Sequence, residues 1–266
     1  MIMKYCGLLL LINLIISCIG SKVRAGFTLV EMSIVLVIVG LIIGGILGGR
    51  ELIEVSRSRE VISEVNSFKT IINTFTDKYS YLPGDFPDAT KNWSVTPAVL
   101  NGNGNGLVSY GFGSGEPYES RPAWRHLYLS GIYPIVMEGA YRNGSSNIGF
   151  WIGNNIPASS ATKSDAGYAI LSGMSGVYDP FYPTRGVENY ILLASKAGSI
   201  ALGNGALTPQ MSISIDKKID DGKADAGKML IKDGRTIAGC VVDASVSPIV
   251  LDYTSDDAHC RIAFYF

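Results

Sequence analysis

The sequence has few of the side chains on which enzymes and metal centres usually depend. Its 266 residues include two histidines, His126 and His259, and four cysteines, none of them in a zinc-type CxxC pair. It contains no GxSxG nucleophile motif, no HExxH and no P-loop. We therefore expect neither an enzyme nor a histidine-rich metal centre, and we expect His126 to pack in a core.

Charge is also scarce, at 17% of the residues, and the formal net charge is −1. A broad basic surface for nucleic acid is therefore not expected. Part of this low charge comes from two apolar runs near the N-terminus. Beyond residue 83 the sequence is rich in Gly, Asn, Ser and Tyr, which indicates an extracytoplasmic domain with many loops.

The two apolar runs differ in length. Residues 5–19 suit the h-region of a signal peptide, because a bilayer span needs about 20 residues. Residues 27–49 carry a single charge and are long enough to cross a bilayer. Lys22 and Arg24 precede this second run, so the positive-inside rule places its N-terminal end in the cytoplasm and the rest of the chain outside.

Proline is missing from the first 82 residues, so nothing breaks a helix before Pro83 and Gly84. Apolar residues recur at spacings of three and four in this part, which predicts an amphipathic helix packed on a globular domain. They are Val61, Val65, Phe68, Ile72, Phe75, Tyr79 and Leu82. The stripe ends after about four turns, which argues against the alternative of a membrane-anchored coiled-coil stalk.

The remaining residues, 83–266, alternate turn signals with short apolar runs. Helices are predicted at 121–133 and at 208–222, where Thr208 suits the N-cap and Gly222 the stop. Strands are predicted at 150–154, 168–173, 189–195, 228–234, 238–245, 248–253 and 261–266. The expected fold is α+β: a long N-terminal helix, transmembrane in its first half and amphipathic in its second, packed on a C-terminal antiparallel sheet domain. The expected divisions are 1–26 (leader), 27–49, 50–82 and 83–266.

Basic residues, Gly26 and the sequence FTLVE stand in register before the second apolar run. This arrangement, from Lys22 to about Leu82, resembles the N-terminus of type IV prepilins and type II secretion pseudopilins. The resemblance implies that a prepilin peptidase cuts between Gly26 and Phe27 and methylates the new amino group of Phe27. It further implies a subunit that starts in the bacterial inner membrane with a periplasmic domain. About 240 residues would remain after cleavage, which is large for a major pilin, so we expect a minor subunit. Such a subunit joins like or related subunits, through an inner-membrane assembly platform, in a type IV pilus or a type II secretion pseudopilus.

Glu31 is the single charge of the second apolar run, where a carboxylate costs roughly 2–3 kcal/mol or more. It matches the glutamate that the family uses in assembly. Pairing with the amino terminus of Phe27 in a neighbouring subunit would relieve this cost and fix the register of the two helices. The alternative is a glutamate that merely extends toward the membrane interface. The proline common within the first helix of major pilins is missing, and glycines can loosen the helix instead: Gly40, Gly44, Gly45, Gly48 and Gly49.

A second interpretation rests on the sequence IISC, Ile15–Cys18, which fits a bacterial lipobox. The protein would then be a lipid-anchored extracytoplasmic binding protein attached through Cys18. A lipoprotein has no use for a second span with Gly26 and Glu31 in register, so the pilin interpretation is favoured. A start at Val23 would leave a very short leader.

The best metal candidates are four aspartates, Asp216, Asp220, Asp221 and Asp225, around the predicted helix end at Gly222. Their order does not fit an EF-hand. Resemblance to pseudopilins that hold calcium in a C-terminal loop makes calcium the candidate cofactor, against the alternative of a solvated helix end. The loop at 101–106 carries Asn where related prepilin-like proteins often have Asp, which weakens a calcium interpretation there.

Two cysteines remain after removal of the leader, Cys240 and Cys260, each in or beside a predicted strand. The topology places both outside the cytoplasm, where oxidation is favoured. We therefore predict a disulfide between them, with a pair of free, buried cysteines as the alternative.

Overall fold

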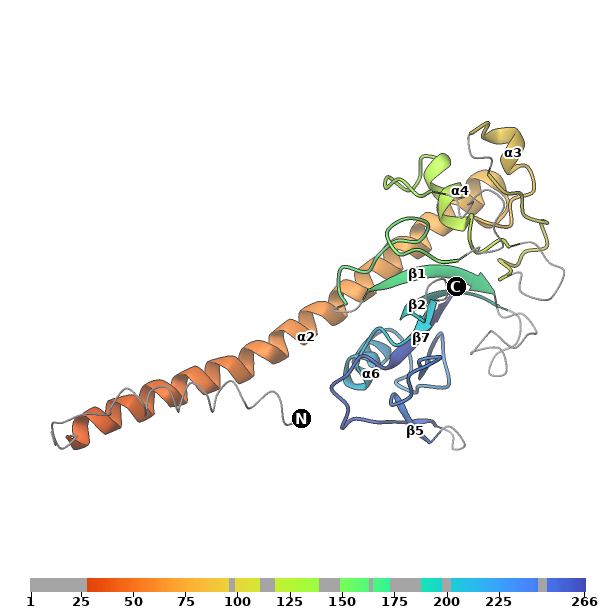
Figure 1. Ribbon diagram of the computed structural model, residues 1–266. Coiled ribbons are helices and arrows are strands. Elements are labelled where there is room, and N and C mark those ends of the chain that lie inside the picture. Colours follow the sequence, from red (N-terminus) through yellow and green to blue (C-terminus); the bar gives the residue numbers. More distant parts are fainter. Residues whose placement is uncertain are drawn as a thin grey trace. The chain divides into compact units, whose positions relative to one another are not determined.

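The computed structural model describes the chain from Thr28 to Phe266 with gaps (Figure 1). The described ranges are 28–95, 99–110, 118–138, 149–162, 165–172, 188–197, 202–243 and 248–266. Two compact units divide between Glu51 and Leu52. The leader, Cys18, Gly26 and Phe27 lie outside the described residues.

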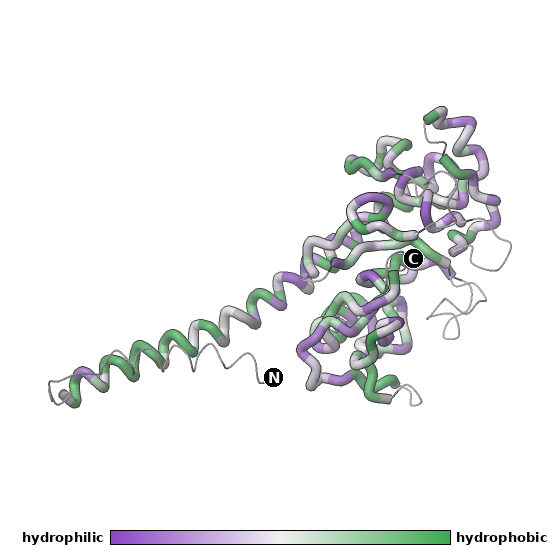
Figure 2. The backbone as a smooth tube through the Cα atoms, viewed as in Figure 1, coloured by the Kyte–Doolittle hydropathy of each residue, from purple (hydrophilic) through white to green (hydrophobic). Residues whose placement is uncertain are grey.

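Helix α2, Leu29–Tyr79, is the longest element. In the part of α2 that belongs to the first unit, the large apolar side chains between Leu29 and Ile46 are exposed, by 45% to 91%. Figure 2 shows this stretch as an almost continuous hydrophobic segment. Among the described residues, α2 is the one helix long and apolar enough to cross a membrane. No described residue covers these side chains, and exposed apolar side chains in such a long run are typical of segments that contact lipid or other chains.

The same helix behaves differently in the second unit. Val61, Val65, Phe68, Ile72 and Phe75 are buried there and form part of the hydrophobic core, as the spacing of apolar residues predicted. The ring of Phe68 lies edge-on to Trp124, with 4.9 Å between the ring centroids, and to Tyr168, with 5.0 Å. The helix ends at the next turn, where Ser80 has a φ of 60°.

The main sheet is antiparallel throughout and has five strands. They are β1 (Ala166–Ser172), β2 (Asn189–Lys196), β3 (Leu202–Asn204), β4 (Met229–Asp233) and β7 (Cys260–Tyr265). The order is β1-β2-β7-β4, and β3 pairs with β2 beyond a register shift at Ser195 and Lys196. Strand β1 and the middle of β2 are buried, so their sequences read as continuous apolar runs rather than as alternating ones.

The other elements are short, apart from α6. A two-stranded antiparallel sheet is formed by β5 (Val241–Asp243) and β6 (Val250–Leu251). The helices are α3 (Ala89–Asn92), α4 (Ala123–Leu129) and α6 (Pro209–Ile219). Thr208 caps α6 as predicted, because its Oγ1 accepts a hydrogen bond of 3.2 Å from the Met211 backbone N–H. The predicted α+β class is confirmed.

One strand prediction was wrong, and one strand was not predicted. Residues 150–154 form no strand: Ile152 makes only an isolated bridge with Ile156, because the chain turns on itself through Gly153 at a φ of +79°. Strand β3 was not predicted, since three residues give no readable alternation.

Candidate functional site

Glu31, the one charged residue in the apolar part of α2, takes part in local hydrogen bonds at the N-terminus of the helix. The backbone N–H and the Oγ1 hydroxyl of Thr28 both donate to Oε2 of Glu31, at 2.9 Å each. The backbone N–H of Glu31 donates to Thr28 Oγ1 at 3.2 Å. This is a capping box, in which an N-cap threonine and a glutamate three residues later satisfy each other's backbone donors. The sequence signal T-x-x-E was available, and the reading of Glu31 as an isolated charge missed it.

The capping box uses one carboxylate oxygen of Glu31. Within the part of the chain that the structure describes, Oε1 of Glu31 accepts no hydrogen bond. The side chain is exposed, and it lies at the start of an apolar segment that no described residue covers. A carboxylate oxygen held in place but without a donor can accept from a group on another chain.

The five helix glycines lie in the same segment, and a Cβ added at Gly40, Gly44, Gly45, Gly48 or Gly49 would meet nothing within 4 Å. Close packing against the described residues therefore does not require glycine at these positions. Their effect within the chain is to lower the helix stability of this segment, by roughly 1 kcal/mol each relative to Ala.

The turn after α2 carries a second set of buried polar groups, which sequence reasoning did not identify. The Asp85 carboxylate accepts from the backbone N–H groups of Gly104 (2.6 Å), Asn105 (3.1 Å) and Gly106 (2.8 Å). The loop at 101–106 therefore directs its amide donors at a carboxylate. It binds a side chain of its own chain rather than offering oxygens to a metal ion.

Glu119 lies beside Asp85 and is fully buried. Its Oε1 accepts from the Asn103 N–H at 2.8 Å and its Oε2 from the Ser109 N–H at 2.9 Å. Burial, together with the neighbouring Asp85 charge, raises the pKa of Glu119 to about 7, against the hydrogen bonds that lower it. Burial also raises the pKa of Asp85, while a hydrogen bond with Glu119 lowers it. A proton held on Glu119 and shared with Asp85 accounts for both directions.

His126 joins this turn to helix α4, with its ring fully buried. The Gly84 N–H donates to its Nδ1 at 3.0 Å, and Nε2 lies 2.9 Å from the Leu100 carbonyl oxygen. These partners require a neutral ring with its proton on Nε2. Burial lowers the pKa of His126 to about 4. His126 therefore has the structural role that the sequence predicted.

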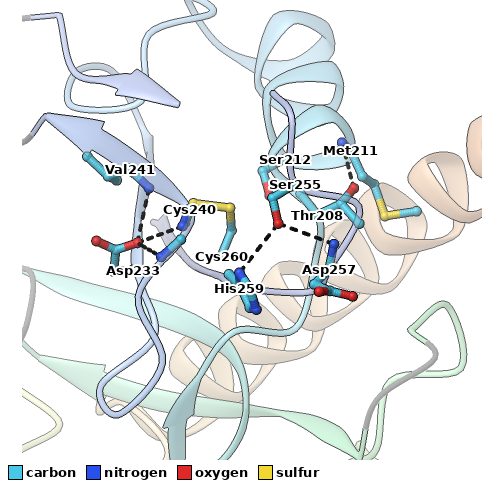
Figure 3. The surroundings of a disulfide bond; sticks show 11 residues. Thr208, Met211, Ser212, Asp233, Cys240, Val241, Ser255, Asp257, His259 and Cys260 are labelled. Atoms are coloured by element: carbon cyan, nitrogen blue, oxygen red, sulfur yellow. Dashed lines mark hydrogen bonds between the residues drawn. A yellow bond between two sulfur atoms is a disulfide. The ribbon is translucent and has the colours of Figure 1, made fainter. Parts of the chain in front are cut away.

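The disulfide between Cys240 and Cys260 is present, with the two Cα atoms 4.9 Å apart and both residues buried (Figure 3). It ties the residue before β5 to the first residue of β7, which lies between β2 and β4 in the main sheet. Oδ1 of Asp233 accepts from the backbone N–H groups of Gly239 (3.1 Å), Cys240 (2.7 Å) and Val241 (3.0 Å). The bridge thus anchors the small β5–β6 sheet to the interior of the larger one.

Three of the four candidate aspartates come together at the end of α6. One carboxylate oxygen each from Asp216, Asp220 and Asp221 lies within 4.8 Å of the others. Asp225 is not part of this group, although it follows four residues later. Burial, together with the charges of Asp220 and Asp221, raises the pKa of Asp216 to about 7.

Comparison with known proteins identifies the N-terminal segment. The family model of the prokaryotic N-terminal methylation motif matches residues 21–47, about a tenth of the chain. This range includes Gly26, Phe27 and Glu31 and ends within the exposed apolar part of α2. Searches of the curated proteins and of the solved structures gave no match. The chain therefore carries, at residues 21–47, the N-terminal methylation motif of type IV pilin-like and pseudopilin precursors.

Proposed function

We propose that the chain is a structural, minor subunit of a type IV pilus or a type II secretion pseudopilus. The observation that carries the proposal is the methylation motif at residues 21–47, placed directly at the start of an apolar helix whose exposed side chains no described residue covers. A prepilin peptidase cuts between Gly26 and Phe27 and methylates Phe27. The chain acts by assembly and not by catalysis.

In this proposal the exposed apolar half of α2 is covered first by lipid and then by the helices of other subunits. Before assembly it lies in the inner membrane, with Lys22 and Arg24 in the cytoplasm and the domain from residue 83 onward in the periplasm. The buried disulfide supports this orientation, since disulfides persist outside the reducing cytoplasm. During assembly the lipid is replaced by the helices of like or related subunits, delivered by an inner-membrane platform.

Glu31 guides this replacement. Its Oε2 caps its own helix, and its Oε1 accepts from the positively charged amino terminus of Phe27 in a neighbouring subunit. A carboxylate in an apolar medium is costly unless it is paired, so the correct axial position of the neighbour is the one that supplies the charge.

Mass spectrometry of the mature N-terminus tests the processing. We expect a chain that begins with N-methyl-Phe27. A mature chain that begins with a diacylated Cys18 would overturn the proposal in favour of the lipid-anchored binding protein.

Three variants separate the cap from the charge. In Glu31→Ala the side-chain acceptor of the capping box and the charge are both lost, and in Glu31→Gln an acceptor oxygen for Thr28 remains while the charge is removed. In Thr28→Ala the hydroxyl is removed while the charge remains. We expect all three to be processed, Glu31→Ala and Glu31→Gln to be lost from filaments, and Thr28→Ala to be incorporated. Normal incorporation of Glu31→Gln together with loss of Thr28→Ala would show that Glu31 acts as a helix cap only.

A further inference from the structure

The turn after α2 holds two buried carboxyl groups in contact with each other. Asp85 is 1% exposed and Glu119 is fully buried, and their side chains are joined by a hydrogen bond. A hydrogen bond between two carboxyl groups needs a proton on one of them, since an ionised carboxyl group can only accept. The closed arrangement therefore contains one proton that the pair shares. If that proton were lost, two like charges would repel each other in a buried site.

Among the described residues, no cation pairs with these two carboxyl groups, because neither Asp85 nor Glu119 forms a salt bridge with any of them. Arg121 is close in sequence, but its guanidinium lies over tyrosine rings, 4.2 Å from the nearer ring centroid. The other titratable groups around the turn include Tyr81 and His126. The His126 ring is neutral near pH 7, since burial lowers its pKa to about 4. A second negative charge in the pair would therefore lack an opposite charge among these neighbours.

Both carboxyl groups bind the same loop, residues 101–106. Asp85 accepts from the three consecutive backbone N–H groups of residues 104–106, at 2.6–3.1 Å, and Glu119 accepts from that of Asn103 at 2.8 Å. Gly102 lies so close to the backbone of Asp85 that a Cβ there would collide with it. Four successive amides thus donate to one pair of carboxyl groups, so the position of the loop depends on the state of that pair.

The chain that follows the loop is attached to the main sheet by groups that do not titrate. The Val108 N–H donates to Oδ1 of Asn189 at 2.9 Å, and Nδ2 of Asn189 donates to the Gly106 carbonyl oxygen at 2.9 Å. The Ser172 N–H donates to the Val108 carbonyl oxygen at 2.8 Å. Residues 101–105 can therefore leave the carboxyl pair while Val108 stays attached to β1 and β2.

We propose that the loop at 101–106 is a pH-sensitive element, held closed by the proton that Asp85 and Glu119 share and opening more readily as that proton is lost. Opening exposes both carboxyl groups to water, where the two charges can separate, so the closed loop binds the proton more tightly than the open loop. The raised pKa of Glu119, about 7, agrees with this order, and it results from burial together with the Asp85 charge. Opening should become easier as the pH rises from 4.5, the ordinary pKa of a glutamate, and should level off above 7.

Opening would change part of the surface that the domain presents. Asn101, Asn103 and Asn105 are exposed residues of this loop. In the closed loop their side-chain oxygens accept from backbone N–H groups at 2.9–3.0 Å, which fixes the direction of the three amides. The inference concerns the second unit alone and holds whether or not the chain assembles. On an extracytoplasmic domain, this surface would respond to the pH of the surroundings.

Amide hydrogen exchange of the full chain in detergent, measured between pH 5.5 and 7.5, tests the proposal. Each rate is divided by the intrinsic rate at the same pH, so that the remaining change reports the opening equilibrium. We expect the protection of the amides of residues 103–106 to fall by about tenfold or more over this range, since opening releases a proton. Low concentrations of urea should not accelerate their exchange, because local opening exposes little surface.

Strand β7, in the middle of the main sheet, provides the reference for unfolding of the whole domain. Its amides should be at least tenfold better protected than those of residues 103–106 and should exchange faster in urea. Equal protection of the two sets, with the same response to urea, would show that the loop opens only when the domain unfolds, and would overturn the proposal. So would wild-type loop protection that is the same at pH 5.5 and 7.5.

Three variants identify the group that holds the proton. Glu119→Gln removes the titrating group, so the protection of residues 103–106 should no longer change with pH. Glu54→Gln, the same substitution at an exposed position of α2, should keep the wild-type dependence. Asp85→Asn should reduce the dependence, because the like charge no longer opposes ionisation of Glu119, and it serves if Glu119→Gln fails to fold. A pH dependence that persists unchanged in Glu119→Gln or in Asp85→Asn would overturn the role of the pair.

Discussion

The two units of the chain treat their apolar and polar side chains in opposite ways. In the first unit the described apolar side chains are exposed, and the one charged group among them is bound by the residue that begins the helix. In the second unit the apolar side chains are buried together with groups that titrate, including Asp85, Glu119, His126 and Asp216. The apolar side chains of the first unit therefore find no cover among the residues that the structure describes. In the second unit the apolar side chains pack on one another, and nearly all of the buried polar groups described above form hydrogen bonds within the chain. These hydrogen bonds fix where the loops lie.

The largest expected effect is on the free energy of unfolding, which should differ between a variant in the second unit and one in the first. Phe75→Ala removes a fully buried ring and should destabilise the domain by about 3–5 kcal/mol, because a cavity remains. Leu36→Ala removes an exposed apolar side chain of the same helix and should leave domain stability unchanged. Chemical denaturation of the full chain in detergent measures both. A similar loss in the two variants would show that the units unfold together.

The second effect concerns the covalent bridge of the second unit. The double variant Cys240→Ser and Cys260→Ser should cost about 3 kcal/mol, since the bridge spans a sequence separation of 20 residues. Reduction of the wild type with dithiothreitol should give the same loss. Labelling of the denatured, unreduced mature chain should find no free thiol. Two alkylated cysteines would contradict the bridge.

The third effect is a change of domain stability with pH that depends on Glu119. Its pKa is raised to about 7 in the folded domain, so the folded state binds its proton more tightly than the unfolded chain does. Its contribution to stability is complete below pH 4.5, the ordinary pKa of a glutamate, and is lost as the pH rises through 7. Glu119→Gln removes this dependence. The stability of the wild type relative to Glu119→Gln should therefore fall between pH 5 and 8, by on the order of 2 kcal/mol.

His126 gives that experiment its internal control. Its pKa is lowered from 6.5 to about 4, so its contribution is complete above pH 6.5 and is lost as the pH falls through 4. In the wild type the two buried groups act in opposite directions between these values. With Glu119→Gln in place, stability should fall as the pH is lowered from 6.5 toward 4. An unchanged pH profile in the variant would mean that Glu119 does not hold the proton.

The smallest effect compares two threonine caps. Thr208→Ala removes the side-chain acceptor of the Met211 N–H and should cost about 1 kcal/mol of domain stability. Thr28→Ala removes the corresponding group from the first unit and should leave the domain unchanged. Melting curves of the two variants provide the comparison. Equal shifts would show that the start of α2 contributes to the domain.

Features that depend on neighbours in sequence could be predicted. The buried stripe of α2, the Thr208 cap and helices α4 and α6 all follow from spacings of a few residues. The Cys240–Cys260 pairing was predictable because the other two cysteines lie in the predicted leader. The methylation motif could be recognised because its signals are contiguous in the sequence.

The polar centre of the second unit could not be predicted in this way. Asp85 lies about 20 residues from the amides that it binds, and the His126 ring meets an amide 42 residues away. Glycine and asparagine at 101–106 indicate a turn but not the group that the turn surrounds. The same limit applies to Asp216, whose helical position suggests a surface residue while the fold buries it completely.

The loop at 101–106 has a consequence for the chemical lifetime of the protein. It contains three Asn-Gly pairs, and asparagine before glycine deamidates when the glycine nitrogen attacks the side-chain amide. All three glycine nitrogens are engaged here: Gly102 donates to the Phe86 carbonyl at 2.9 Å, and Gly104 and Gly106 donate to the Asp85 carboxylate. A nitrogen that donates to a fixed acceptor is not free to lose its proton and close the succinimide ring. These hydrogen bonds therefore slow the deamidation of a sequence that would deamidate quickly in an unfolded chain.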